Sequence, residues 1–157
     1  MGANMAKRTD ISALEDHTGY WMRRASNYVS QAFASKLATK DSTVAEWVLL
    51  RLLHGQEACS PSLIAAQMGM TKGAITKLVD RLAARSLVAR SAHADDGRAQ
   101  TIRLTTKGKK LLPVLSSLAD QNDRECFSSL PAKDLENLQR ILKALCTEQG
   151  ATTIPTE

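Results

Sequence analysis

The residues with the clearest chemical potential lie in the stretch RSAHADDGRAQTIRL, residues 90–104. Asp96, Gly97 and Arg98 form a turn sequence there, between two short runs that are typical of strands. An arginine at a hairpin tip has no packing role, but its planar guanidinium suits the negative minor groove of DNA. Asp96 can hold that guanidinium extended before DNA arrives. A solvated Asp–Arg surface pair, worth ~0–1 kcal/mol, is the alternative interpretation.

A second group of residues begins the stretch TKGAITKLVDRLAAR, for which we predict a helix capped by Thr71. Spacing of i, i+3, i+4 and i+7 predicts an inward stripe of Ile75, Leu78, Val79 and Leu82. Small residues on the opposite face would let the helix enter a major groove, where hydroxyls and lysines reach bases or phosphates. The candidate DNA-binding residues of this face are Thr71, Lys72, Gly73, Thr76 and Lys77. An ordinary amphipathic helix with a polar outer face is the alternative.

The distribution of charge favours a polyanionic partner. The chain carries a net charge of +5, but residues 71–110 hold ten basic and three acidic residues, a local charge of +7. The remainder is therefore slightly acidic, at −2. A basic block within an otherwise slightly acidic chain indicates that one face meets a polyanion, although a solvated helix surface would also be basic.

The elements that must position these residues follow from the apolar pattern and the capping residues. We predict one long helix over residues 10–40, a second, buried helix over 44–54 and a short third helix that begins at Ser60-Pro61 and ends at Gly69. The apolar positions of the third helix are Leu63, Ile64 and Met68.

Strands are expected at residues 87–90 and 101–104. Another helix starts at Thr105, and Pro113 should kink it. A last helix opens at Pro131, with a leucine stripe suited to helix packing that consists of Leu135, Leu138, Leu142 and Leu145.

This order of elements predicts a mainly α protein with a small β-hairpin wing, a winged helix-turn-helix with helical dimerisation extensions. The predicted parts are an N-terminal dimerisation helix (10–40), a winged DNA-binding domain (43–104), C-terminal dimerisation helices (105–148) and a disordered tail (149–157).

The run LIAAQMGMTKGAITKLVDRLAARSLVARSAHADDGRAQTIRLTTKG resembles the core of the MarR family of bacterial transcription regulators. The specific signals are the Asp96-x-Arg98 wing and "LTTKG" at 104–108, supported by "LVDRL" at 78–82. The N-terminal runs "GYWMRRA" and "EWVLLRLL" are also similar to family members, so the resemblance spans most of residues 14–146.

This resemblance implies a homodimer in which the first and the last two helices of each chain interlock. Two recognition helices would then read a pseudo-palindromic operator in double-stranded DNA, with half-sites ~10 bp apart, and Arg98 would enter the minor groove. The family usually has glycine where this chain has Ser86. A serine at positive φ would cost on the order of 1 kcal/mol, unless the helix ends in another way.

Family resemblance also implies that DNA binding responds to an effector, which we expect to be a small lipophilic or phenolic compound. Candidate pocket residues, which supply aromatic walls and an anion-binding group, are His17, Tyr20, Trp21, Arg24, Trp47 and Arg51. Core and dimer packing is the alternative role for these six. The spacing of histidines and cysteines does not favour a metal sensor. The peroxide-sensing branch of the family carries a cysteine in the first helix, whereas the first cysteine of this chain is Cys59, after that helix.

Other classes of protein find little support in the sequence. No stretch approaches the length of a membrane span and no signal peptide is evident, so we expect a cytoplasmic protein without a membrane partner. No phosphate loop, nucleophile elbow or metal triad is present, which argues against an enzyme or a bound cofactor. The three cysteines are expected to be inert. The competing function is a basic helical interaction module that binds an acidic protein partner.

Overall fold

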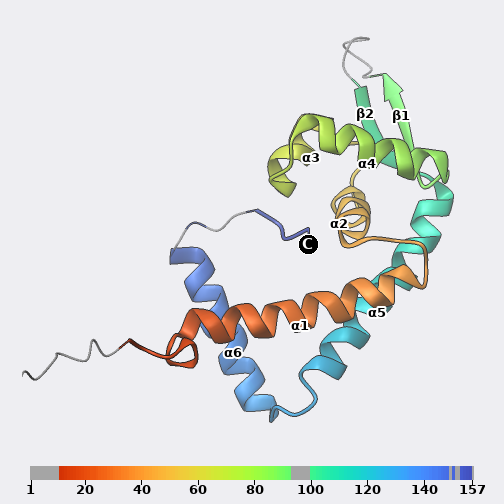
Figure 1. Ribbon diagram of the computed structural model, residues 1–157. Helices are drawn as coiled ribbons and strands as arrows, with labels where there is room; N and C mark the ends of the chain where they lie inside the picture. Colours follow the sequence, from red (N-terminus) through yellow and green to blue (C-terminus); the bar gives the residue numbers. More distant parts are fainter. Residues whose placement is uncertain (1–10, 93–99, 149, 151–152, 157) are drawn as a thin grey trace, which may run out of the picture.

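The computed structural model describes residues 11–92, 100–148, 150 and 153–156. This part of the chain is mainly helical, with one two-stranded antiparallel sheet, which confirms the predicted fold class (Figure 1). The elements are η1 (Leu14–Asp16), α1 (Thr18–Ala38), α2 (Val44–Leu53), α3 (Pro61–Met68), α4 (Lys72–Ala84), β1 (Val88–Ala92), β2 (Gln100–Leu104), α5 (Thr106–Cys126) and α6 (Ala132–Glu148).

The core lies where α2, α3 and α4 pack against the hairpin and the start of α5. Its largest fully buried side chains are Leu37, Leu49, Leu50, Leu53, Ile64, Ile75, Leu78, Val79, Leu82, Leu87, Ile102 and Leu115. The strands pair from Val88 opposite Leu104 to Ala92 opposite Gln100. Cys59 extends this sheet by one residue, because its N–H and C=O both bond to Ile102, at 2.9 and 2.8 Å. The wing is therefore anchored to the loop before α3.

Helix α2 begins at a reciprocal cap. The Thr43 hydroxyl accepts a hydrogen bond from the Glu46 N–H at 3.2 Å, and the Glu46 carboxylate accepts one from the Thr43 N–H at 2.9 Å. This capping box satisfies two amides that the helix leaves without partners. Burial of five of the ten residues of α2 agrees with its predicted central position.

Helix α3 confirms the predicted cap and buries two of its three apolar positions. The Ser60 hydroxyl accepts from Leu63 N–H at 3.2 Å, Pro61 is the first helical residue, and Gly69 closes the helix at φ +62°. Ile64 and Met68 are buried, but the Leu63 side chain is 46% exposed. Leu63 therefore faces outward, and Ala65 supplies the buried position next to Ile64.

The first long helix is shorter than predicted. It starts at Thr18 rather than at residue 10, and residues 14–16 form a separate 3-10 turn. His17 between them is extended, at φ −96° and ψ 122°, and the Asp16 carboxylate accepts from the Ala13 N–H at 2.9 Å. An aspartate that bonds its own upstream backbone competes with a continuous helix, which explains the later start.

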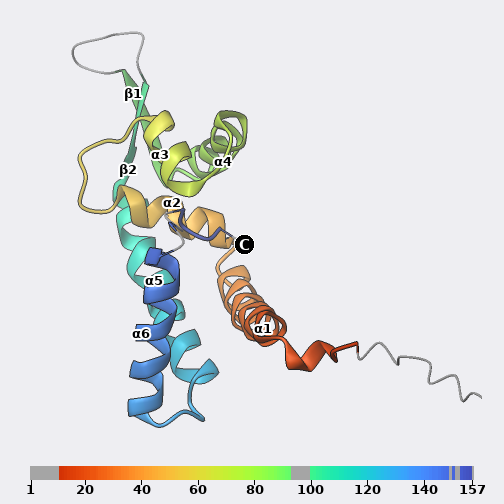
Figure 2. The same cartoon turned by 90° about the vertical axis from the view of Figure 1, so that its left-hand side faces the viewer.

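Helices α1, α5 and α6 extend away from the winged domain (Figures 1 and 2). Pro113 lies inside α5, which continues past it to Cys126. Asn122 of α5 is buried and donates to the Val29 carbonyl of α1 at 3.2 Å, and the Lys36 ammonium lies 2.7 Å from the Glu125 carboxylate. These polar contacts join helices from opposite ends of the chain.

Helix α6 turns back from the lower end of α5 toward the winged domain (Figure 2). None of its residues is buried, and Ile141, Leu142 and Leu145 are 40–47% exposed. The predicted leucine stripe is therefore present on a helix that this chain does not cover.

Among the described helices, none is both long and apolar enough to cross a membrane.

Candidate nucleic-acid interface

The outer face of α4 carries the predicted recognition residues. The four residues of the inward stripe, Ile75, Leu78, Val79 and Leu82, are at most 1% exposed. All five residues predicted to meet DNA are exposed, and these are Thr71, Lys72, Gly73, Thr76 and Lys77. The helix thus presents two ammonium groups, two threonines and a glycine on a single solvent-facing surface.

Hydrogen bonds at the start of α4 determine which groups remain free. The Thr71 hydroxyl accepts from the Ala74 N–H at 3.2 Å, and the Thr76 hydroxyl donates to the Lys72 carbonyl at 2.9 Å. The Thr71 oxygen therefore still has its proton to donate, whereas the Thr76 proton is engaged with the backbone. Amides of the first helical turn add partial positive charge at this end, which favours phosphate.

Gly73 has no structural reason within this chain to be a glycine. A Cβ placed on it meets no atom within 4 Å, and its φ is not positive. A glycine inside a helix costs roughly 0.5–1 kcal/mol relative to alanine. Close approach of the helix backbone to an external partner is the remaining physical use of a missing side chain.

The end of α4 is held in a fixed geometry before the wing. Ser86 adopts φ +59°, and two bonds close the helix, from Ser86 N–H to Ala83 O at 2.8 Å and from Leu87 N–H to Leu82 O at 2.9 Å. This is a Schellman motif with serine at the position that favours glycine. The serine is therefore accommodated by a strained backbone, rather than by a different helix end.

Helix α5 approaches this motif closely. A Cβ on Gly108 would collide with the Leu87 carbonyl oxygen, so glycine is required for the contact. The Thr105 hydroxyl is 2.7 Å from the Ser86 carbonyl and 3.1 Å from that of Leu87, and the Lys107 ammonium donates to the Arg85 carbonyl at 2.9 Å. The "LTTKG" sequence thus fixes the base of the wing to the end of α4.

Ion pairs brace α4 on either side. The buried Glu46 carboxylate lies 3.5 Å from the Arg85 guanidinium and 3.9 Å from that of Arg81. The Asp80 carboxylate lies 2.6 Å from the Arg90 guanidinium of β1. Glu46 ties the recognition helix to α2, and Asp80 ties it to the wing. The sequence did not mark Glu46 as a link, because its two arginine partners lie 35 and 39 positions further along the chain.

The wing strands confirm the predicted hairpin and are longer than predicted, at residues 88–92 and 100–104. They project from the end of the molecule that also carries α3 and α4 (Figure 1). Asp96 and Arg98, the residues predicted to contact DNA from the tip, lie outside the described residues. Their role remains a prediction from the sequence.

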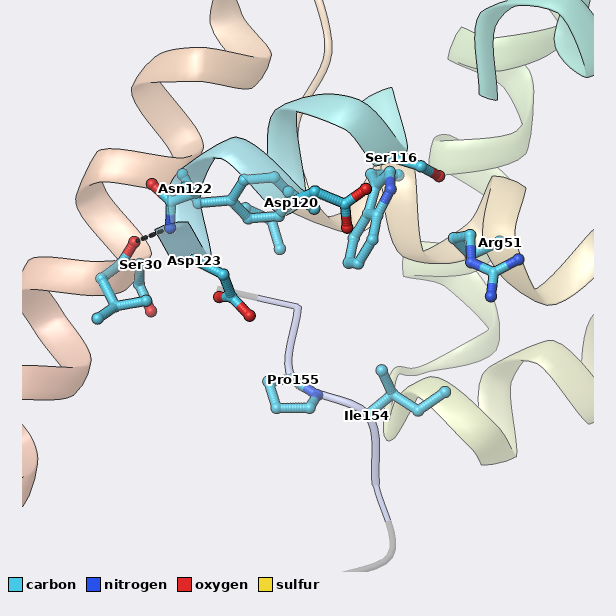
Figure 3. A pocket seen from close by; sticks show the side chains of 13 residues that line it. Ser30, Arg51, Ser116, Asp120, Asn122, Asp123, Ile154 and Pro155 are labelled. Atoms are coloured by element: carbon cyan, nitrogen blue, oxygen red, sulfur yellow. Dashed lines mark hydrogen bonds between the residues drawn. The ribbon is translucent and has the colours of Figure 1, made fainter. Parts of the chain in front are cut away.

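A cavity of about 750 Å³ lies between α1, α2 and α5 (Figure 3). Of the six candidate pocket residues, the structure brings Trp47 and Arg51 into it. Phe33 packs edge-on against Trp47, with ring centroids 5.1 Å apart. The lining residues are Val29, Ser30, Phe33, Val44, Trp47, Arg51, Ser116, Ala119, Asp120, Asn122, Asp123, Ile154 and Pro155. Sequence reasoning missed the polar contribution of α5, since nothing marked that face of the helix as inward.

The other four candidate pocket residues lie elsewhere, at or just before the start of α1. His17 is exposed and precedes the helix. The Tyr20 and Trp21 rings meet edge to face at 5.3 Å, and the Arg24 guanidinium lies 5.7 Å from the Trp21 ring centroid. Tyr20, Trp21 and Arg24 therefore form an aromatic and cationic cluster that is separate from the cavity lining.

The three described cysteines differ in exposure, since Cys59 is buried, Cys126 is half-buried and Cys146 is exposed. Burial raises the pKa of the Cys59 thiol, which donates to the Gln56 side chain at 2.6 Å. A raised pKa keeps the thiol protonated and unreactive. Within residues 11–92 and 100–148, no group of three histidine, cysteine or acidic side chains is placed to hold a metal ion.

Comparison with known proteins gives a consistent result. Residues 42–99 match the model of the MarR family. The chain is 25% identical over 131 residues to the HTH-type transcriptional repressor IacR of Pseudomonas putida, an alignment that covers 83% of this chain and 78% of IacR.

Solved structures extend the similarity to the helical regions. A probable transcriptional regulator from Pseudomonas aeruginosa superposes with a TM-score of 0.75 at 27% identity, covering 85% of this chain and 99% of that one. CouR from Rhodococcus jostii RHA1, solved bound to p-coumaroyl-CoA, gives a TM-score of 0.72 at 26% identity and covers 86% and 95% of the two chains. The similarity therefore includes α1 and α5 as well as the winged domain.

Proposed function

We propose that this chain, which belongs to the MarR family of transcription regulators, represses transcription as a homodimer. The homodimer binds a pseudo-palindromic operator, and a small lipophilic or phenolic effector releases it. The observation that carries the DNA-binding part is the division of α4 into two faces. Its inward residues are almost fully buried, whereas its outward threonines, lysines and Gly73 are exposed.

On this proposal α4 enters the major groove with its N-terminal end. Lys72 and Lys77 neutralise phosphates, Thr71 donates its free proton, and Gly73 allows the backbone to approach the bases. Arg98 enters the adjacent minor groove, and Asp96 orients it. The ion pair between Asp80 and Arg90 supports this arrangement, because it joins α4 to the strand that leads to the tip.

Exposed apolar side chains support the dimer. Trp21, Met22 and Tyr28 on α1 are 47–63% exposed, and Ile141, Leu142 and Leu145 on α6 are 40–47% exposed. Several large apolar side chains exposed on the same helix are typical of an interaction surface. A twofold dimer through these helices would place two winged domains on successive major grooves, with half-sites ~10 bp apart.

The cavity is the proposed effector site. It combines aromatic walls, Phe33 and Trp47, with polar groups at its rim, including Arg51, Asp120 and Asp123. Pockets of this size and composition are typical of small-molecule sites. The similar protein CouR is described as bound to p-coumaroyl-CoA, which is an aromatic thioester, and this supports an effector with an aromatic part.

Selection of duplexes from a random pool tests the proposal. An operator reader should enrich one inverted repeat, and its affinity should fall steeply with salt. A basic module for an acidic protein would enrich no sequence, and that result would overturn the proposal. On the selected duplex, Arg98→Ala should cost roughly 1–3 kcal/mol of binding, whereas Lys133→Ala on the exposed surface of α6 is a matched charge control without effect.

Gly73→Ala separates DNA binding from folding. Since a Cβ at this position meets no atom of the chain, the variant should gain up to about 1 kcal/mol in unfolding free energy. The same methyl group should weaken binding to the selected duplex, because it keeps the backbone away from the bases. An unchanged DNA affinity would remove Gly73 from the interface.

A further inference from the structure

The C-terminal segment, residues 153–156, lies against the molecule, although the sequence predicted a disordered tail. The Ile154 N–H donates to the Gln67 carbonyl of α3 at 3.1 Å. Ile154 packs against the core, and Thr153 covers Gly69, whose added Cβ would come within 3.0 Å of the Thr153 methyl group. The segment therefore has a defined seat at the end of α3.

This seat opens directly into the cavity. Ile154 and Pro155 form one side of the lining, opposite Asp120 and Asp123 (Figure 3). The end of the described chain lies close to α2 in both overall views (Figures 1 and 2). Part of the space that would otherwise face Trp47 is thus taken by the protein's own tail.

We propose that residues 153–156 occupy the α3 side of this cavity, next to the roughly 750 Å³ that stays open, and that an effector reaching this side must displace them in order to bind. The displacement by an effector rests on the effector site proposed above, whereas the position of the tail in the cavity does not.

The tail sequence suits such a removable occupant. Pro155 fixes its own φ and biases Ile154 toward an extended conformation, which reduces the entropy lost when the segment docks. Ile154 is one apolar side chain with one backbone hydrogen bond, so the docked state is held weakly enough to exchange. A tethered segment of this kind competes at an effective concentration of roughly millimolar.

Two buried polar atoms explain why an effector can win this competition. The Trp47 indole nitrogen and the Gln67 side-chain oxygen have no hydrogen-bond partner among the described residues. Ile154 and Pro155 offer the indole no side-chain acceptor. A ligand whose acceptor oxygen reached one of these atoms would give it a hydrogen-bond partner that the docked tail does not provide.

Displacement would also reach the DNA-binding surface. Gln67 and Gly69 end α3 and begin the turn into α4, so the seat of the tail and the start of the recognition helix are three residues apart in sequence. Release of the tail removes Thr153 from Gly69 and frees the Gln67 carbonyl. The tail thereby connects the occupancy of the cavity with the support of the helix-turn-helix.

Fluorescence of Trp47 tests the occupancy without an effector or DNA. In a Trp21→Phe background Trp47 is the single tryptophan, since the chain has two. Truncation after Gly150 and the point variant Ile154→Asp should each red-shift its emission and increase quenching by acrylamide. Thr156→Ser, in the same tail, is the matched control and should behave like the parent. Identical emission and quenching in all four proteins would overturn the proposal.

Restoring the tail in trans gives the second measurement. A fluorescein-labelled peptide of residues 151–157 should bind the truncated chain, reverse the red shift and bind the full chain far more weakly, because the full chain's own tail occupies the seat. A peptide with aspartate in place of isoleucine should not bind. Equal binding of the parent peptide to both chains would contradict the proposal. Circular dichroism and binding to the selected duplex confirm that the truncated chain is folded.

Competition with an effector is measured with 4-hydroxycinnamate as the probe. If the tail occupies the cavity about nine-tenths of the time, its removal should tighten probe binding roughly tenfold. Equal affinities for the full and truncated chains would overturn the competition. Failure of the probe to bind either chain would count against the effector class proposed above, whereas Trp47 fluorescence still decides where the tail lies.

Discussion

The winged domain buries most of its large apolar side chains, whereas the helical frame formed by α1 and α6 leaves most of them exposed. In α2, α3, α4 and the hairpin, almost every large apolar residue lies in a core that one chain completes. On α1 only Leu37 is buried, and on α6 no residue is. The winged domain therefore completes its core within one chain, whereas α1 and α6 leave large apolar side chains exposed, which the proposed dimer would cover.

The largest expected effect comes from charging the uncovered face of α6. Leu142→Glu combined with Leu145→Glu should abolish the proposed dimer, because it places charges in an apolar contact. Light scattering should show a monomer, and operator affinity should fall by at least about tenfold with the loss of the second half-site. Gln139→Glu, which adds charge at an exposed polar position of the same helix, should leave the dimer intact. A monomeric parent protein would show that no second chain covers the exposed face of α6.

A change inside the winged domain should act on folding rather than on assembly. Gly108→Ala forces a methyl group into the Leu87 carbonyl, and overpacking of this kind costs about 1–3 kcal/mol. Gly19→Ala on α1, where an added Cβ meets nothing, should be neutral or slightly stabilising. Denaturant titration of both variants measures this contrast. Equal destabilisation of the two variants would mean that Gly108 is not required for the close approach of α5 to the Leu87 carbonyl.

A smaller, stabilising effect is expected at the end of the recognition helix. Ser86→Gly relieves the positive φ of +59° and should raise the unfolding free energy by about 1 kcal/mol. Ser86→Ala keeps the Cβ that causes the strain and should change little. The midpoint of thermal unfolding compares the two, and a gain in the alanine variant would show that the serine hydroxyl, not the backbone, is unfavourable.

The smallest effect concerns the contact between α1 and α5. The bond from Lys36, supported by Gln121, lowers the pKa of the Glu125 carboxylate. A carboxylate with a lowered folded pKa stabilises the protein above its unfolded pKa, and this contribution disappears as the pH falls through the folded value. Glu125→Gln should therefore be less stable than the parent at neutral pH and equal to it in acid. A constant difference across pH would assign the effect to packing instead.

Local signals explain why most of the winged domain was predictable. Ser60 and Thr71 each cap the helix that was assigned to them, because a cap depends on residues three positions apart. The stripe from Ile75 to Leu82 is buried as its spacing indicated. Hairpin strands could also be located, since turn residues and alternation are local.

Long-range features were not readable from the sequence. Buried Asn122 reaches a carbonyl 93 positions earlier, and no local pattern marks it as an inward residue. His17, Tyr20, Trp21 and Arg24 have the composition of a ligand site. They lie outside the cavity lining, because the residues of α1 that line it come later in the helix, from Val29 to Phe33. The seat of Ile154 on α3 likewise depends on a contact between distant segments.

The contacts between α1 and Asn122 also have a consequence for synthesis of the protein. Lys36 and Val29 leave the ribosome well before their partner, which follows 86 and 93 residues later. During that interval α1 has no α5 to pack against, while the short-range contacts of α2, α3 and α4 can already form. A nascent chain would thus acquire its DNA-reading part first and dock its N-terminal helix only near completion, which limits premature pairing of unfinished copies.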